Sequence, residues 1–129
     1  MLDTNVAIHL RDGDPEIAAR LAAFGMRLVM SVVSRVELEG GTAISSDPRR
    51  RLLLDRMLAD IDVLPFTDAE AMAYGVIVGQ VGHDRRRVLD RMIAAQAIAA
   101  DMTLITINGA DFRGISGLKL EVWDTPADA

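Results

Sequence analysis

Three acidic side chains stand at positions where predicted strands end or predicted helices begin. Asp3 follows an apolar segment of two residues, and Glu37 follows the apolar run 28–30. Asp90 lies in the first turn of a predicted helix. The carboxyl ends of parallel strands share one edge of a sheet, where open α/β sheets bind ligands. Three carboxylates about 4 Å apart would repel by roughly 4 kcal/mol per pair, so such a cluster requires a cation or protons.

A hard divalent cation, Mg²⁺ or Mn²⁺, is the metal that these residue types favour. The chain contains no cysteine and only two histidines, which argues against a thiolate site or a histidine-based zinc site. Carboxylate oxygens are the preferred ligands of Mg²⁺ and Mn²⁺ in proteins. We therefore expect the three acids to share such an ion.

The acids also have purely structural explanations. Ser34 and Glu37 have the spacing of a capping box, in which Glu37 would close the start of a helix. Acidic residues are common in the first turn of helices, which would account for Asp90. Asp90 nevertheless shares a helix face with the apolar or small side chains of Ile93 and Ala97, which predicts that it points inward. Buried acids are costly unless they are paired or bound to a metal.

Two more polar residues, Asn108 and Asp111, follow the predicted strand 103–106. Asn-Gly at 108–109 is a routine turn signal, and Asp111 could cap such a turn. The same positions would place both side chains at the carboxyl edge of the sheet. Thr106, the last residue of this strand, could add a hydroxyl group to a polar network there.

The predicted elements that must hold these residues alternate between strands and helices. Besides the segment that ends at Asp3, short apolar runs predict strands at 28–30, 62–66, 103–106 and 118–123. Apolar periodicity and caps predict helices at 6–10, 14–25, 34–41, 47–61, 67–82 and 89–100. The alternation predicts a three-layer α/β fold, a mostly parallel sheet of about 4–5 strands flanked by helices. We expect residues 1–129 to form one domain, with a frayed tail at 125–129.

Charge and hydropathy limit the class of protein. A net charge of −5 and a pI of about 4.9 argue against a nucleic-acid-binding protein. Arginines are nevertheless clustered at 49–51 and 85–87, and cations bound to an acidic site would offset its negative charge. No apolar run approaches the roughly 18 residues of a membrane span, and no secretory signal is visible. We therefore expect a cytoplasmic protein without membrane association.

Five segments, in order along the chain, are similar to one known family. They are Leu-Asp-Thr-Asn at 2–5, Glu-Leu-x-x-Gly at 37–41, Asp-x-x-Ile-Ala-Ala at 90–95, Leu-Ile-Thr-x-Asn at 104–108 and Asp-Phe at 111–112. The ending, Gly-Leu-Lys-Leu-Glu-Val-Trp at 117–123, is similar as well. Together these segments resemble the PIN-domain nucleases, and above all the VapC-type toxins of bacterial toxin–antitoxin pairs. The resemblance spans essentially the whole chain and implies a PIN-like fold.

The resemblance implies a Mg²⁺- or Mn²⁺-dependent endoribonuclease whose products carry a 5′-phosphate and a 3′-hydroxyl. The first three acids of the family match Asp3, Glu37 and Asp90, which would hold the metal. The fourth position, often Asp in the family, matches Asn108, which carries no charge. Either the site therefore binds one metal strongly, or Asp111 substitutes nearby. Asn108 would then hydrogen-bond a metal-bound water, and Asp111 would support it or a second, weaker ion.

Three polar neighbours are expected to support these acids. Thr4 matches the hydroxyl that the family carries beside its first acid, where it would contact an acid or a metal-bound water. Asn5 and Thr106 are expected in the same supporting layer.

The resemblance further implies an RNA substrate, a VapB-type antitoxin and a homodimer. Arg85, Arg86 and Arg87 directly precede Asp90 and could bind RNA phosphates, although a solvated charged loop explains them equally well. Arg11 could bind RNA or an acidic side chain of the antitoxin.

Two other classes of protein stay open from the sequence. The chain could be a PIN-like binding module without activity, in which Asn108 marks a decayed site. It could also be a signal-receiver-like domain, which gathers acids at the same edge of a sheet. The only lysine is Lys119, and the Lys-Pro step typical of receivers is missing, which argues against this second class.

Overall fold

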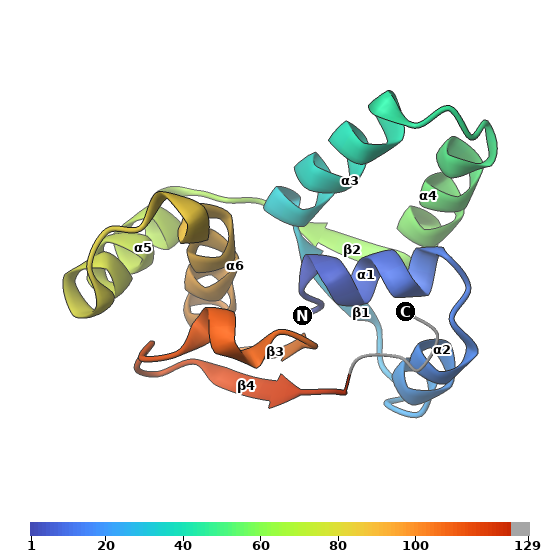
Figure 1. Ribbon diagram of the computed structural model, residues 1–129. Helices are drawn as coiled ribbons and strands as arrows, with labels where there is room; N and C mark the ends of the chain where they lie inside the picture. Colours follow the sequence, from blue (N-terminus) through green and yellow to red (C-terminus); the bar gives the residue numbers. More distant parts are fainter. Residues whose placement is uncertain (125–129) are drawn as a thin grey trace.

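The computed structural model describes residues 1–124, so the predicted frayed tail at 125–129 lies outside the described residues. Strands and helices alternate as the sequence predicts (Figure 1). In chain order the elements are α1 (Thr4–Arg11), α2 (Pro15–Ala22), β1 (Leu28–Ser31), α3 (Val32–Ile44), α4 (Arg49–Asp60), β2 (Ile61–Leu64), α5 (Asp68–Val81), the 3₁₀ helix η1 (Arg85–Arg87), α6 (Val88–Ala99), β3 (Thr103–Thr106), the 3₁₀ helix η2 (Gly109–Phe112) and β4 (Lys119–Val122).

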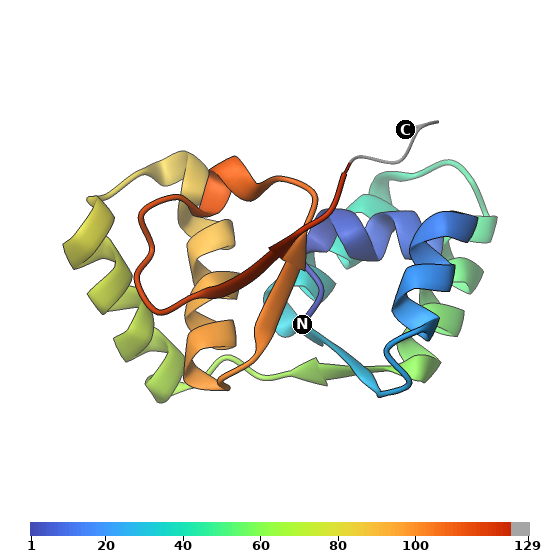
Figure 2. The ribbon, with the colours of Figure 1, turned by 90° about the horizontal axis from the view of Figure 1, so that it is seen from below.

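A single residue, Leu2, joins two pairs of parallel strands into one sheet. Strand β1 pairs with β2, and β3 pairs with β4. Leu2 forms parallel bridges to Met30 of β1 and to Ile105 of β3, which gives the order β2–β1–Leu2–β3–β4. Figure 2 shows the N-terminus between these two strands. Because all the strands are parallel, the next residue, Asp3, emerges at their common carboxyl edge.

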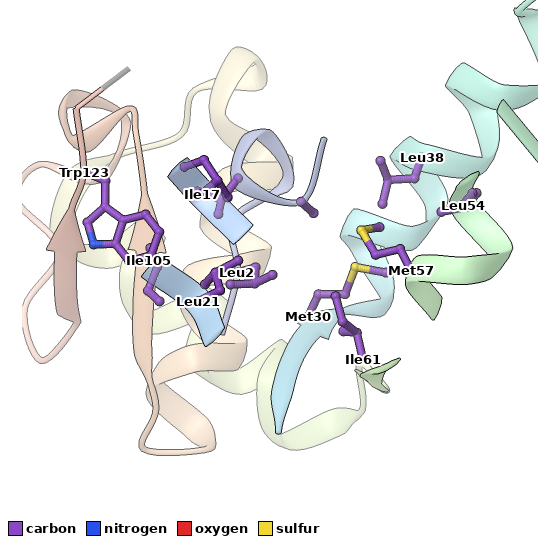
Figure 3. Packing of buried hydrophobic residues seen from close by; sticks show 12 residues of the cluster. Leu2, Ile17, Leu21, Met30, Leu38, Leu54, Met57, Ile61, Ile105 and Trp123 are labelled. Atoms are coloured by element: carbon purple, nitrogen blue, oxygen red, sulfur yellow. The ribbon is translucent and has the colours of Figure 1, made fainter. Parts of the chain in front are cut away.

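Helices cover both faces of this sheet, which confirms the predicted three-layer architecture. Successive strand residues point to opposite faces, so Leu2 and Ile105 join one core cluster while Met1 and Leu104 join another. Figure 3 shows Leu2 beside Ile17 and Leu21 of α2 in the first cluster. The second cluster is built mainly from α5 and α6, which Figure 1 places together, apart from α1, α3 and α4.

Two helix starts follow from local sequence signals. Asp14 caps α2 by accepting a hydrogen bond from the Ile17 N–H at 3.0 Å, and Pro15 occupies the first helical position. Thr67 and Glu70 form the predicted capping box of α5. Each signal lies within one turn of the helix that it starts, so no distant residue is needed to form it.

The predicted capping box at Ser34 is wrong, because the N-cap of α3 lies three residues earlier. Ser31 at the end of β1 is the N-cap, and its hydroxyl accepts a hydrogen bond from the Val33 N–H at 2.9 Å. Ser34 lies inside the helix and is fully buried. Glu37 therefore stands in the second turn, where it has no role in capping. Helix capping therefore does not explain the presence of this acid.

No helix within residues 1–124 is both long enough and apolar enough to cross a membrane.

Candidate metal-binding active site

Asp3 is a buried carboxylate held in place from two sides. It is the N-cap of α1 and accepts hydrogen bonds from the Thr4 N–H at 2.9 Å and from the Thr106 hydroxyl at 2.8 Å. Burial raises the pKa of Asp3, these two hydrogen bonds oppose the rise, and nearby Glu37 and Asp111 add to it. The side chain is thus fixed at the sheet edge with several acids around it.

The side chain of Thr4 connects the start of α1 to Glu37 on α3. Its hydroxyl donates a hydrogen bond to Glu37 Oε1 at 2.8 Å and lies 2.9 Å from Ser34 Oγ. Glu37 is therefore oriented toward the start of α1. Ser34 belongs to this network, which its expected capping role does not predict, although its position three residues before Glu37 places both on one helix face.

Asp90 enters the same cluster from the first turn of α6. The residues three, four and seven positions later, Ile93, Ala94 and Ala97, are fully buried, so this helix face points toward the core. Burial is the main reason why the pKa of Asp90 rises to about 6. Repulsion from Asp3 and other nearby acids adds to the rise.

A fourth acid, Asp111 on η2, completes this group. Its charge raises the pKa of both Asp3 and Asp90, so it lies within electrostatic reach of each. The guanidinium of Arg87 pairs directly with Asp111. Arg87 is therefore engaged at the rim of the acid cluster, whereas Arg85 and Arg86 are exposed.

Asn108 shapes the turn that carries Asp111. Its backbone N–H donates to the Thr106 hydroxyl at 2.9 Å, and its carbonyl accepts from the Asp111 N–H at 3.0 Å. The negative charge beside β3 thus comes from Asp111, and a role of the Asn108 amide toward a metal-bound water stays a prediction. Asn5 is exposed on α1 rather than packed behind the acids.

The donor set fits a hard divalent cation. All the candidate ligands are carboxylate oxygens. Burial raises the pKa of Asp3 and of Asp90, and repulsion from neighbouring acids adds to each rise. Within residues 1–124, no group of three or more acidic or histidine side chains is placed so that all of them could hold one metal ion, so the expected three-acid site is not formed in this arrangement. Mg²⁺ retains several waters and is commonly bound through only one or two carboxylates, which Asp3 and Asp90 could supply.

The parallel sheet and the acids at its carboxyl edge define a known class of domain. Residues 1–118 match the model of the PIN domain, and the chain belongs to this family. It is 31% identical over 127 residues to the "tRNA(fMet)-specific endonuclease VapC" of Shigella flexneri, a match that covers 95% of this chain and 96% of the relative. The predicted resemblance is confirmed, and the receiver-like alternative is wrong.

Two solved structures share the fold over nearly the whole chain. One is the DNA-bound VapBC from Salmonella typhimurium, with a TM-score of 0.84, 28% identity, and coverage of 95% of this chain and 96% of that one. The other is VapBC2 from Rickettsia felis bound to a DNA fragment from its promoter, with a TM-score of 0.81 and 28% identity. This second match covers 96% of this chain and 98% of that chain.

Proposed function

We propose that this chain is a Mg²⁺- or Mn²⁺-dependent endoribonuclease that hydrolyses phosphodiester bonds in RNA. The observation that carries the proposal is the buried carboxylate of Asp3, fixed by two hydrogen bonds and surrounded by Asp90, Glu37 and Asp111. Near full-length similarity to relatives named as VapC endonucleases supports the same conclusion.

Each acid has a distinct task in this proposal. Asp3 and Asp90 would hold the cation, and Glu37 would contact it directly or through a water molecule. When bound, the cation lowers the pKa of a coordinated water and offsets charge on the phosphate in the transition state. The carboxylates accept hydrogen bonds from the attacking water and so orient it. The Thr4 hydroxyl holds Glu37 in place, and the pair of Arg87 with Asp111 limits the negative charge at the rim.

Initiator tRNA is the first substrate to test, because the Shigella flexneri relative is named for it. We expect cleavage of this tRNA in Mn²⁺ or Mg²⁺, loss of cleavage in EDTA, and products with a 5′-phosphate. An elongator tRNA serves as the control for selectivity, and mapping of the new 5′ ends locates the bond. RNA binding without cleavage in either metal would instead identify an inactive binding module.

A VapB-type antitoxin is the proposed partner, because the structural neighbours are VapBC complexes.

We also propose a homodimer. Helix α5 exposes Met72, at 74% of its surface, and Val76, which fits an apolar contact between two copies. Light scattering of the purified chain measures the mass. A monomer at all concentrations would contradict the dimer.

Replacing Thr4 with valine should lower cleavage by about tenfold, because Glu37 loses the hydroxyl that orients it. Thr4→Ser keeps the hydroxyl and should retain activity near that of the wild type. The measurement is single-turnover cleavage of the best RNA substrate at saturating Mn²⁺. Wild-type activity of Thr4→Val would show that the hydrogen bond to Glu37 is not needed for cleavage.

A further inference from the structure

A hollow of about 360 Å³ opens beside the acid cluster and extends away from it between α1 and α3. Thr4 and Glu37 line one end of the hollow, and Arg11 and Arg50 also contribute to its wall. A larger hollow, of about 550 Å³, lies between α2 and α4 and contains none of the four acids. The smaller hollow is therefore the one continuous with the proposed active site.

The residues of α1 and α3 that line this hollow define its two ends. Thr4, Ile8 and Arg11 follow one another at four- and three-residue spacing and so share one face of α1. Thr4 and Arg11 are two turns apart, which is about 10 Å along the helix axis. Across the hollow, α3 contributes Glu37 and, one turn later, Gly41. Thr4 and Glu37 thus mark the end next to the acid cluster, and the arginines mark the other end.

The arginine end carries a net positive charge in an otherwise acidic protein. Arg11 Nε and Arg50 Nη1 share a single carboxylate oxygen of Asp12, at 3.0 and 2.9 Å. Two guanidinium groups against one carboxylate leave a net charge of +1. The Arg11 side chain is only 8% exposed, so its position is defined by packing. A guanidinium has more N–H donors than these contacts use, and the remaining donors suit a phosphate.

We propose that this hollow is a subsite for the nucleotide next to the bond that is cleaved, with its phosphate on Arg11 and Arg50. The inference rests on the proposed ribonuclease function. A strand whose scissile phosphate lies at the acids would pass Ile8 and Gly41 and place a neighbouring phosphate about 10 Å away. Gly41 leaves room for the sugar and base, because a Cβ atom built there meets no atom within 4 Å.

A matched pair of glycine variants tests the subsite. Gly41→Leu fills the hollow, whereas Gly40→Leu adds the same side chain to the same helix at a position that does not line it. Both changes favour the helix, so neither should lower the melting temperature. We expect Gly41→Leu to weaken RNA binding about tenfold and Gly40→Leu to leave it unchanged. Binding is measured by fluorescence anisotropy of a labelled single-stranded RNA in Mg²⁺, with Asp90→Asn in every protein to prevent cleavage.

A pair of arginine variants tests the phosphate contact. Arg50→Ala should weaken binding and reduce the slope of log affinity against log salt by about 0.7, the value for one phosphate of a single strand. Arg49→Ala is the control, because Arg49 lies on the same helix, is exposed and pairs with Asp47. It should leave the slope unchanged.

Three results would overturn the subsite. Wild-type affinity and salt slope in both Gly41→Leu and Arg50→Ala would exclude it while leaving the ribonuclease function intact. Loss of binding to an oligoglutamate peptide in these variants, with RNA binding unchanged, would assign the hollow to an acidic protein segment instead. Failure of the unsubstituted chain to bind or cleave any RNA would refute the ribonuclease function itself, and the subsite with it.

Discussion

Asp90→Asn should abolish RNA cleavage and, at the same time, stabilise the metal-free protein. The substitution removes one of the two carboxylates that hold the cation, for which we expect at least a 100-fold loss of activity. It also removes a half-buried charge that is repelled by Asp3 and Asp111. We expect the free energy of unfolding in EDTA near pH 7 to rise by about 1 kcal/mol, since water partly screens this carboxylate.

The pH dependence of stability gives the same prediction an independent check. Because the pKa of Asp90 is about 6 in the folded protein and lower when unfolded, the folded state binds more protons between about pH 4 and 6. The wild type in EDTA should therefore gain stability as the pH falls from about 7 to 5. This gain should be smaller in Asp90→Asn, where, among residues 1–124, the raised pKa of Asp3 still contributes in the same direction.

Urea unfolding at several pH values and a cleavage assay measure the two effects. The exposed Asp60→Asn is the control, and it should change neither property. Undiminished metal-dependent cleavage by Asp90→Asn would refute its assignment as a ligand. A loss of stability in EDTA would instead show that the Asp90 carboxylate stabilises the metal-free fold, contrary to what its raised pKa indicates.

Leu2→Ala should lower the free energy of unfolding by about 2–5 kcal/mol, the largest loss of stability that we expect from a single substitution. Leu2 is fully buried, and its parallel bridges to Met30 and Ile105 connect β1 with β3. A cavity there would loosen the centre of the sheet, and Asp3 is attached directly to it. A loss of this size is a large share of the about 5–15 kcal/mol that stabilises a typical domain. It should therefore also disturb the position of Asp3 and weaken metal binding.

Urea unfolding measures the loss, and the Mn²⁺ dependence of the melting temperature reports on the site. Leu52→Ala removes the same atoms from a side chain that is 51% exposed, and it should cost less than about 0.5 kcal/mol. Equal effects of the two substitutions would mean that Leu2 does not hold the sheet together.

The sequence alone was sufficient for features that depend on neighbouring residues. Asp14 before Pro15 and the box from Thr67 to Glu70 were predicted because caps are built within one helical turn. The alternation of strands and helices likewise predicted a parallel sheet with acids at its carboxyl edge. The resemblance to the PIN family then selected Asp3, Glu37 and Asp90 from the nineteen acidic residues of the chain.

Only the tertiary structure decided which distant residues meet. The start of α3 shifted from Ser34 to Ser31 because Ser31 closes a strand, while Ser34 is buried against Thr4, thirty residues away. The pairing of Arg87 with Asp111 spans 24 residues.

The contact of Arg50 with Asp12 spans 38 residues. Such contacts arise from the order of the strands and the packing of helices on them, and neither periodicity nor capping signals encode them. The sequence therefore determined which residues of the proposed site carry charge. The fold decided that Asp111 lies near Asp3 and Asp90 and that a hollow with two arginines lies beside Glu37, because both depend on contacts between segments that are distant in the sequence.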